Sequence, residues 1–138
     1  MALALAEVDT RPGAFADAPI TDAEAAAMFR AALNLFVCWG VTDEQASTLL
    51  DLPLRSFRRW KAEGPGRIDR DGRARLSNLM GIHKALRIVF REPDRGYRWV
   101  KRANDAFGGR SAIAVMLGGE LTDLMRVRRY LDSLRGGH

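Results

Sequence analysis

The segment Val41–Gly64 has the pattern of two short helices joined by a tight turn, and it constrains the fold more than any other part of the chain. Thr42 is a suitable N-cap residue, and Gln45 follows it by three positions, which completes a capping box. The run Asp51–Pro53 then interrupts the first helix, because the residue before a proline is displaced from the helical region. Pro53 is suited to open the second helix, where its missing N–H is not needed.

The second helix of this pair is strongly two-sided. Its apolar residues are spaced by three and face one side: Leu54, Phe57 and Trp60. A short helix with basic residues on its other side can enter the DNA major groove while the preceding helix crosses the backbone. Arginine suits this role because its planar guanidinium matches a guanine edge or a phosphate. We predict a DNA-contacting surface that comprises Thr42, Gln45, Arg55, Ser56, Arg58, Arg59 and Lys61. The alternative is a helical hairpin whose arginines form a solvated face.

Charge is distributed unevenly along the chain. Residues 1–51 include two basic and eight acidic residues, whereas residues 52–138 include twenty basic and nine acidic residues. Nineteen of the 22 positively charged residues are arginines, which favours planar, bidentate contacts over diffuse attraction. A basic block that starts at the predicted recognition helix fits a polyanion-binding surface. Composition alone leaves open a solvated surface that is simply rich in arginine.

Helical periodicity dominates the chain, and no stretch alternates with the period of a strand, so we predict an all-α fold. Thr21 is the expected N-cap of a long helix that ends at Gly40. Residues 63–73 are rich in glycine, proline and charge, which predicts a loop. Further helices are expected at residues 72–91, 94–103, 111–117 and 120–135. Residues 1–20 lack periodicity and are predicted to form a flexible N-terminal tail.

Several classes of function lack the residues that they need. The chain has one cysteine and two histidines, so we expect no metal, no cofactor and no internal disulfide. Cys38 lies in an apolar run and is predicted to be a small core residue. Cys38 and His83 fall in separate helices and no Gly-rich phosphate loop is present, so we expect no enzyme. No run is long enough to span a membrane and no signal-peptide pattern is present, which predicts a cytoplasmic protein.

The run Ser56-Phe57-Arg58-Arg59-Trp60 and the spacing before it resemble the helix-turn-helix of the Xre repressor family. The C-terminal third resembles, more specifically, the toxin-binding domain of Xre/MbcA/ParS-type antitoxins. The matching positions are Trp99, Asn104, Phe107, Gly108, Gly109 and Ser111, followed by a final helix with Val127, Tyr130, Leu131 and Leu134. The chain departs from the family pattern at Asp51, where glycine is usual, and at Ala103 and Ala112, where proline is usual.

This resemblance implies three parts: the N-terminal tail at residues 1–20, an Xre-like helix-turn-helix domain at residues 21–91 and a toxin-binding domain at residues 92–138. It implies a RES-domain toxin, which consumes NAD or transfers from it, as protein partner. It also implies operator DNA as a second ligand, and a homo-oligomer that forms a hetero-oligomer with the toxin. In such antitoxins the C-terminal end enters the active-site cleft of the toxin. The resemblance therefore assigns toxin contact to Trp99, Asn104, Phe107, Gly108, Gly109, Ser111, Leu134, Arg135, Gly136, Gly137 and His138.

The residues alone also support plainer interpretations. Asn104 suits a turn, Gly108 and Gly109 suit positive φ, and Ser111 suits an N-cap, so packed helices without a partner account for all four. The C-terminal end can simply fray.

Two functions compete with an autoregulating antitoxin. One is a transcriptional repressor whose C-terminal part serves only dimerisation. The other is a protein whose helix-turn-helix no longer binds DNA, which Asp51 and the acidic first helix would permit.

Overall fold

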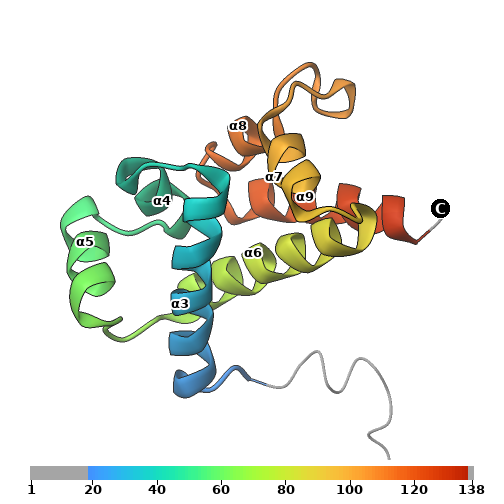
Figure 1. Cartoon of the computed structure of the whole chain (residues 1–138). Helices are drawn as coiled ribbons and strands as arrows, with labels where there is room; N and C mark the ends of the chain where they lie inside the picture. The colour runs from blue at the N-terminus through green and yellow to red at the C-terminus, as the bar shows by residue number, and fades with distance from the viewer. Residues whose placement is uncertain (1–18, 137–138) are drawn as a thin grey trace, which may run out of the picture.

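The computed structural model of the chain describes residues 19–136, and within that range the fold is helical, as the periodicity predicts. Seven α-helices and one 3-10 helix follow one another along this part of the chain (Figure 1). Their bounds are α3 Asp22–Trp39, α4 Asp43–Leu50, α5 Leu54–Glu63, α6 Arg70–Val89, α7 Pro93–Lys101, η1 Asp105–Phe107, α8 Ala112–Met116 and α9 Leu121–Arg135. The one extended pairing in the described range is a single bridge between Ala103 and Ser111.

Helix α6 is the central element of the arrangement. It packs against α3 and α4 on the helix-turn-helix side and against α7 and α9 on the other side. In Figure 1 α5 lies at one extreme of the molecule, and the C-terminal end of helix α9 lies toward the opposite extreme. None of the helices within residues 19–136 has both the length and the hydrophobicity needed to cross a bilayer.

The helix boundaries follow from local capping interactions. Thr21 and Glu24 form a capping box at the start of α3, and Thr42 and Gln45 form the predicted one at the start of α4. Gly40 ends α3 with a φ of 67°, a left-handed conformation that glycine adopts without steric cost. These boundaries agree with the sequence-based expectation because each depends on residues at most four positions apart.

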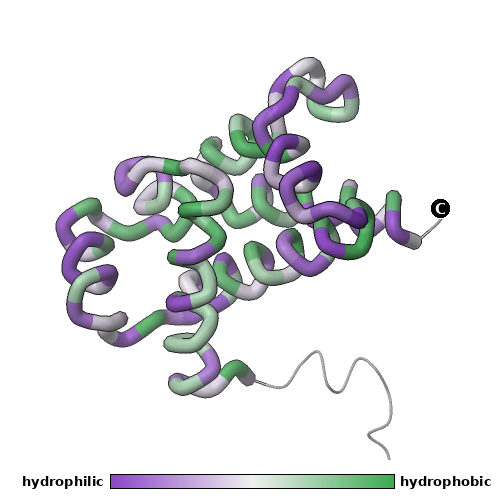
Figure 2. The backbone as a smooth tube through the Cα atoms, in the orientation of Figure 1, coloured by the Kyte–Doolittle hydropathy of each residue, from purple (hydrophilic) through white to green (hydrophobic). Residues whose placement is uncertain are grey.

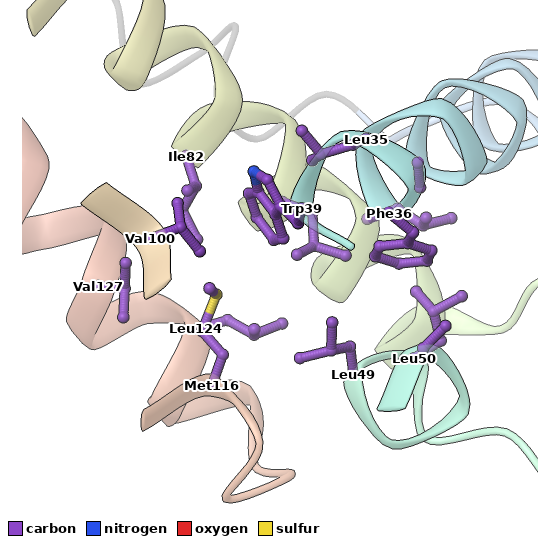
Figure 3. Close-up of a cluster of buried hydrophobic side chains, with 14 of the residues drawn as sticks. Leu35, Phe36, Trp39, Leu49, Leu50, Ile82, Val100, Met116, Leu124 and Val127 are labelled. Carbon is purple, nitrogen blue, oxygen red and sulfur yellow. The ribbon is translucent and has the colours of Figure 1, made fainter. Parts of the chain in front are cut away.

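The core is one continuous hydrophobic cluster to which most helices contribute (Figure 3). Trp39 of α3, Ile82 of α6 and Val100 of α7 are fully buried in it, and Leu124 and Val127 of α9 are buried with them. Full burial of a large apolar side chain contributes about 1.5–3 kcal/mol. Figure 2 shows the corresponding alternation of apolar and polar residues along the helices, with polar residues prominent on α5 and α7.

The predicted burial of Cys38 is wrong. Cys38 is exposed instead of buried, because the buried residues of α3 follow the 3.6-residue period through Leu35, Phe36 and Trp39. Cys38 and His83 belong to separate helices as expected, yet both line one surface pocket between α3, α6 and α7. Burial, and secondarily Arg87, lower the pKa of His83, so its imidazole is neutral at pH 7.

Helix α6 begins earlier than expected, at Arg70, so the predicted loop at residues 63–73 is too long by one turn. The N-cap is Asp69, whose carboxylate accepts a hydrogen bond of 2.8 Å from the backbone N–H of Gly72. This cap was overlooked because it lies within a segment dominated by glycine, proline and charge.

Asp51 occupies the turn between α4 and α5 in a left-handed conformation, with a φ of 52° and a ψ of 47°. It is the only described non-glycine residue with positive φ. Its N–H is hydrogen-bonded to the carbonyl of Thr48 at 3.2 Å, and the N–H of Leu52 returns to the carbonyl of Ser47 at 2.9 Å. The departure from the family's glycine is therefore accommodated by the tolerance of aspartate for this conformation.

Replacement of Asp51 by glycine is expected to stabilise the protein. The left-handed conformation is unfavourable for a residue with a Cβ, and its relief outweighs the added freedom of the unfolded chain, for a net gain of about 0.5–1 kcal/mol in the free energy of unfolding. Urea denaturation of Asp51→Gly and of Asp51→Ala measures this: glycine raises the midpoint and alanine lowers it. A lower midpoint for Asp51→Gly would show that the carboxylate has a stabilising role beyond the backbone.

Candidate DNA-binding and toxin-binding surfaces

Helix α5 is held in place by a small aromatic cluster. Phe57 is buried, and its ring lies 6.3 Å from that of Phe29 and 6.4 Å from that of Phe36. Trp60 packs edge-on against Phe29 at 5.7 Å and remains partly exposed, and Leu54 is partly exposed as well. Edge-to-face aromatic pairs of this kind are favourable beyond the area that they bury. The predicted apolar side of α5 thus anchors the helix through Phe57 and leaves its opposite side in solvent.

Arg75 of α6 holds the C-terminal end of α4 in place. The sequence alone does not indicate this role. Its side chain is buried, and its guanidinium donates hydrogen bonds to the Leu49 carbonyl at 3.2 Å and to the Asp71 carboxylate at 2.7 Å. The first of these bonds satisfies a carbonyl in the last turn of α4, which has no partner within its own helix. The i,i+4 spacing of Asp71 and Arg75 within α6 is visible in the sequence. The hydrogen bond from Arg75 to Leu49 of α4 is not, because it depends on how the two helices pack.

The structure divides the predicted DNA-contacting residues of α5 into two groups. Arg55 and Arg59 are exposed and lie one turn apart on the side of α5 away from Phe57, with Ser56 beside them and partly exposed. Arg58 and Lys61 lie on the side that faces α4 and form ion pairs with acids of that helix. The sequence pattern grouped these residues together because helical spacing within α5 says nothing about the charges on α4.

Thr42 and Gln45, the two predicted DNA-contacting residues of α4, both serve its N-terminus. The Thr42 hydroxyl accepts a hydrogen bond from the Gln45 N–H at 3.1 Å, and the Gln45 side-chain carbonyl accepts one from the Thr42 N–H at 2.9 Å. Gln45 keeps its amide –NH2 as a donor, and Thr42 is exposed. Both residues therefore cap the helix and still offer a hydrogen-bond donor to a phosphate, through the Thr42 hydroxyl and the Gln45 amide.

Two of the predicted toxin-contacting residues meet in a second aromatic cluster. The Trp99 ring stacks on that of Tyr130 at 6.1 Å with an interplanar angle of 4°, and Phe107 lies 5.3 Å from Tyr130 and 6.3 Å from Trp99. The Arg126 guanidinium sits over the Phe107 ring at 5.4 Å. Trp99 and Tyr130 are partly exposed, so the cluster presents aromatic surface beside a cation. Arg126 had not been assigned to this site, because only the fold brings α9 against η1.

The loop between α7 and α8 is built as the sequence suggests. The Asn104 side chain accepts a hydrogen bond from the Ala106 N–H at 2.9 Å, and its backbone carbonyl accepts one from Gly109 at 3.0 Å. Gly108 and Gly109 have φ values of 67° and 88°. Ser111 caps α8 by accepting from the Ala114 N–H at 3.1 Å. The turn, positive-φ and capping roles are confirmed, and toxin contact by these residues remains a prediction.

The C-terminal tail, residues 134–138, begins within the last turn of α9. Leu134 is 45% exposed and is one of three large apolar side chains exposed among the described residues, together with Val37 and Ile88. Arg135 is exposed and lies 3.7 Å from the Asp132 carboxylate, and Gly136 follows as the C-cap. Gly137 and His138 lie outside the described residues.

The DNA-contacting and toxin-contacting predictions thus fall on two separate surfaces, near opposite ends of the molecule (Figure 1). One is a helix-turn-helix with exposed arginines on its second helix, and the other is a partly exposed aromatic cluster beside the last helix. This arrangement defines a helix-turn-helix protein with an additional C-terminal helical binding unit.

Two family models match consecutive parts of the chain. Residues 18–81 match the antitoxin Xre-like helix-turn-helix domain, and residues 85–137 match the antitoxin Xre/MbcA/ParS C-terminal toxin-binding domain. The chain therefore belongs to the Xre/MbcA/ParS family and is an antitoxin of a toxin–antitoxin system.

Two individual proteins are similar to the chain over most of its length. The uncharacterized protein y4oB of Sinorhizobium fredii (strain NBRC 101917 / NGR234) is 42% identical over 122 residues, which is 88% of this chain and 91% of that protein. A chain in the crystal structure of the M. tuberculosis MbcT-MbcA toxin-antitoxin complex superposes with a TM-score of 0.55 at 25% identity, covering 81% of this chain and 94% of that chain.

Proposed function

We propose that this antitoxin neutralises a RES-domain toxin by inserting its C-terminal tail into the active site, and that it represses its own operon by binding operator DNA. The observation that carries the proposal is the toxin-binding domain match over residues 85–137, which include most of this tail. The RES class of the toxin comes from the family resemblance of that region. A cytoplasmic location and a homo-oligomer that binds toxin are part of the same proposal.

The end of α9 has features suited to insertion into a narrow cleft. Leu134 presents apolar surface that the fold does not bury, and Arg135 adds a cation beside it. The following glycine pair lets a thin backbone approach closely. The aromatic cluster of Trp99, Phe107 and Tyr130 would then form the docking surface beside the cleft.

DNA binding is supported by the outward side of α5. Arg55 and Arg59 are exposed one turn apart on a helix that α4 and the aromatic anchor hold rigidly. A rigid helix with two outward arginines is suited to base edges or phosphates in the major groove. A dimer would place two such helices in successive half-sites.

Removal of residues 134–138 is expected to abolish toxin neutralisation and to leave DNA binding nearly unchanged. The reason is that the tail contributes the inserted group, whereas α5 lies at the other end of the molecule. Growth of cells that co-express the truncated chain with the toxin encoded beside it measures the first effect, and binding to the promoter duplex measures the second. Full protection by the truncated chain would contradict insertion of the tail.

Single replacements of Arg55 and Arg59 by alanine are expected to weaken DNA binding. For each phosphate contact that is lost, the plot of log K against log salt should become shallower by about one unit. An arginine that reads a base should instead cost about 1–3 kcal/mol and relax specificity at one position. Fluorescence anisotropy with the promoter duplex measures both effects. Unchanged affinity in both variants would remove these residues from the DNA-binding surface.

A further inference from the structure

Asp43, in the first turn of α4, pairs with two of the cations predicted to contact DNA. Its Oδ1 accepts a hydrogen bond from Lys61 Nζ at 2.9 Å, and its Oδ2 accepts one from Arg58 Nε at 3.3 Å. Glu44 adds a second acid, with Oε2 3.5 Å from Nη2 of Arg58. Arg58 and Lys61 are three residues apart, so both reach α4 from one side of α5. The folded chain thus already supplies counter-charges to two cations of the predicted DNA-contacting surface.

These ion pairs lie at the surface and are open to exchange. The side chains of Arg58 and Lys61 are 54% and 52% exposed, and that of Asp43 is 30% exposed. Exposed pairs typically contribute only about 0.2–1 kcal/mol, so a DNA phosphate can displace the carboxylate. The hydrogen bond from Lys61 and, after it, the one from Arg58 keep the pKa of the Asp43 carboxyl below its usual range, so the acid is charged at neutral pH.

Arg55 and Arg59 have a different environment. Both lie on the side of α5 opposite Phe57, and within residues 19–136 neither forms an ion pair with an acid of α4. A phosphate or a base edge can meet these two arginines without displacing an acid. Helix α5 therefore carries two arginines that are open to DNA, Arg55 and Arg59. Its other two cations, Arg58 and Lys61, are paired with acids of α4.

We propose that Asp43 is an internal competitor for DNA phosphate. In the free protein it occupies Arg58 and Lys61, and this weakens binding to DNA of any sequence. The inference rests on the proposed DNA binding by α5 and identifies how that surface is regulated. A cation that already has a protein counter-charge gains less from a phosphate, because it brings fewer counterion-releasing contacts to the complex.

The competition favours sequence discrimination. Phosphate contacts supply affinity that is independent of sequence, whereas contacts to base edges supply specificity. A carboxylate that reduces the phosphate contribution lowers non-specific affinity and leaves a larger share of the binding to Arg55 and Arg59. Asp43 is thus a positioning residue that acts through Arg58 and Lys61, and it touches no DNA itself.

The test compares binding of the full-length chain and of Asp43→Asn to a random-sequence duplex of about 30 base pairs over a range of KCl concentrations. Asp43→Asn should bind more tightly, by about fivefold at 0.15 M salt for each phosphate contact that it adds. Its plot of log K against log salt should be steeper by about 0.9 for each such contact. Asp43→Glu, which keeps the carboxylate, should resemble the unaltered chain.

Asp132→Asn is the matched control. Asp132 also lies near two cations, with Arg128 at 3.9 Å and Arg135 at 3.7 Å, but it is on α9. The control makes the same change in net charge, and the slope for DNA should stay the same. The triple variant that adds Arg58→Ala and Lys61→Ala to Asp43→Asn should lose the gain. Urea denaturation of each variant verifies that the helices remain folded.

Each outcome has a defined meaning. If the unaltered chain and Asp43→Asn bind with the same slope, Asp43 is not a competitor, and the proposed DNA binding by α5 still stands. An equal steepening in Asp132→Asn would attribute the effect to net charge and would also overturn the inference. If neither protein binds any duplex, both the DNA-binding proposal and this inference fail. Binding by Asp43→Asn alone would support the inference most strongly.

Discussion

The packing of α6 between two groups of helices is the interaction on which the rest of the structure depends. Its buried residues Leu79, Ile82 and Leu86 join one cluster with α3 on one side and with α9 on the other. The approach of α9 is close enough that the Arg128 guanidinium lies against Gly81, within 2.5 Å of where a Cβ would stand. The two candidate surfaces are therefore attached to one rigid core, although they lie near opposite ends of the molecule.

The helix-turn-helix depends on this core through two contacts of different kinds. Phe57 anchors α5 by apolar packing, and Arg75 of α6 anchors the end of α4 by hydrogen bonding to a backbone carbonyl. Both contacts leave the outward side of α5 open. The ion pairs between Asp43 and α5 are weaker and exchangeable by comparison. Rigid placement of the helix and adjustable charge on its flank are thus supplied by separate residues.

Local patterns predicted much of this structure. The capping box of Thr42 and Gln45 and the N-cap at Ser111 involve residues close in sequence, so the sequence displays them directly. The apolar run around Cys38 suggests burial, but the helical period leaves Cys38 outside the buried stripe of α3. The Arg75–Leu49 bond joins residues 26 positions apart, and such pairs are set by the packing of whole helices.

The toxin-binding surface was predicted from resemblance to a family and only partly from physical pattern. Sequence spacing explained the turn at Asn104 and the glycine pair after Phe107, but the stacking of Trp99 on Tyr130 depends on how α7 and α9 pack. The packing brings Arg126 to the same cluster. The structure therefore supplies the shape of the predicted surface, and the match of residues 85–137 to a toxin-binding domain is the reason to expect toxin contact there.

We propose that this chain is the specific inhibitor of a toxin encoded beside it, and co-expression of the two proteins tests the proposal. The neighbouring reading frame is expressed alone and together with the full chain, and growth and co-purification are scored in the same cells. We expect that the neighbour alone stops growth, and that this chain restores growth and elutes with it as a stable complex. A neighbour that is harmless, or that fails to bind this chain, would show that the chain is not the inhibitor of that protein.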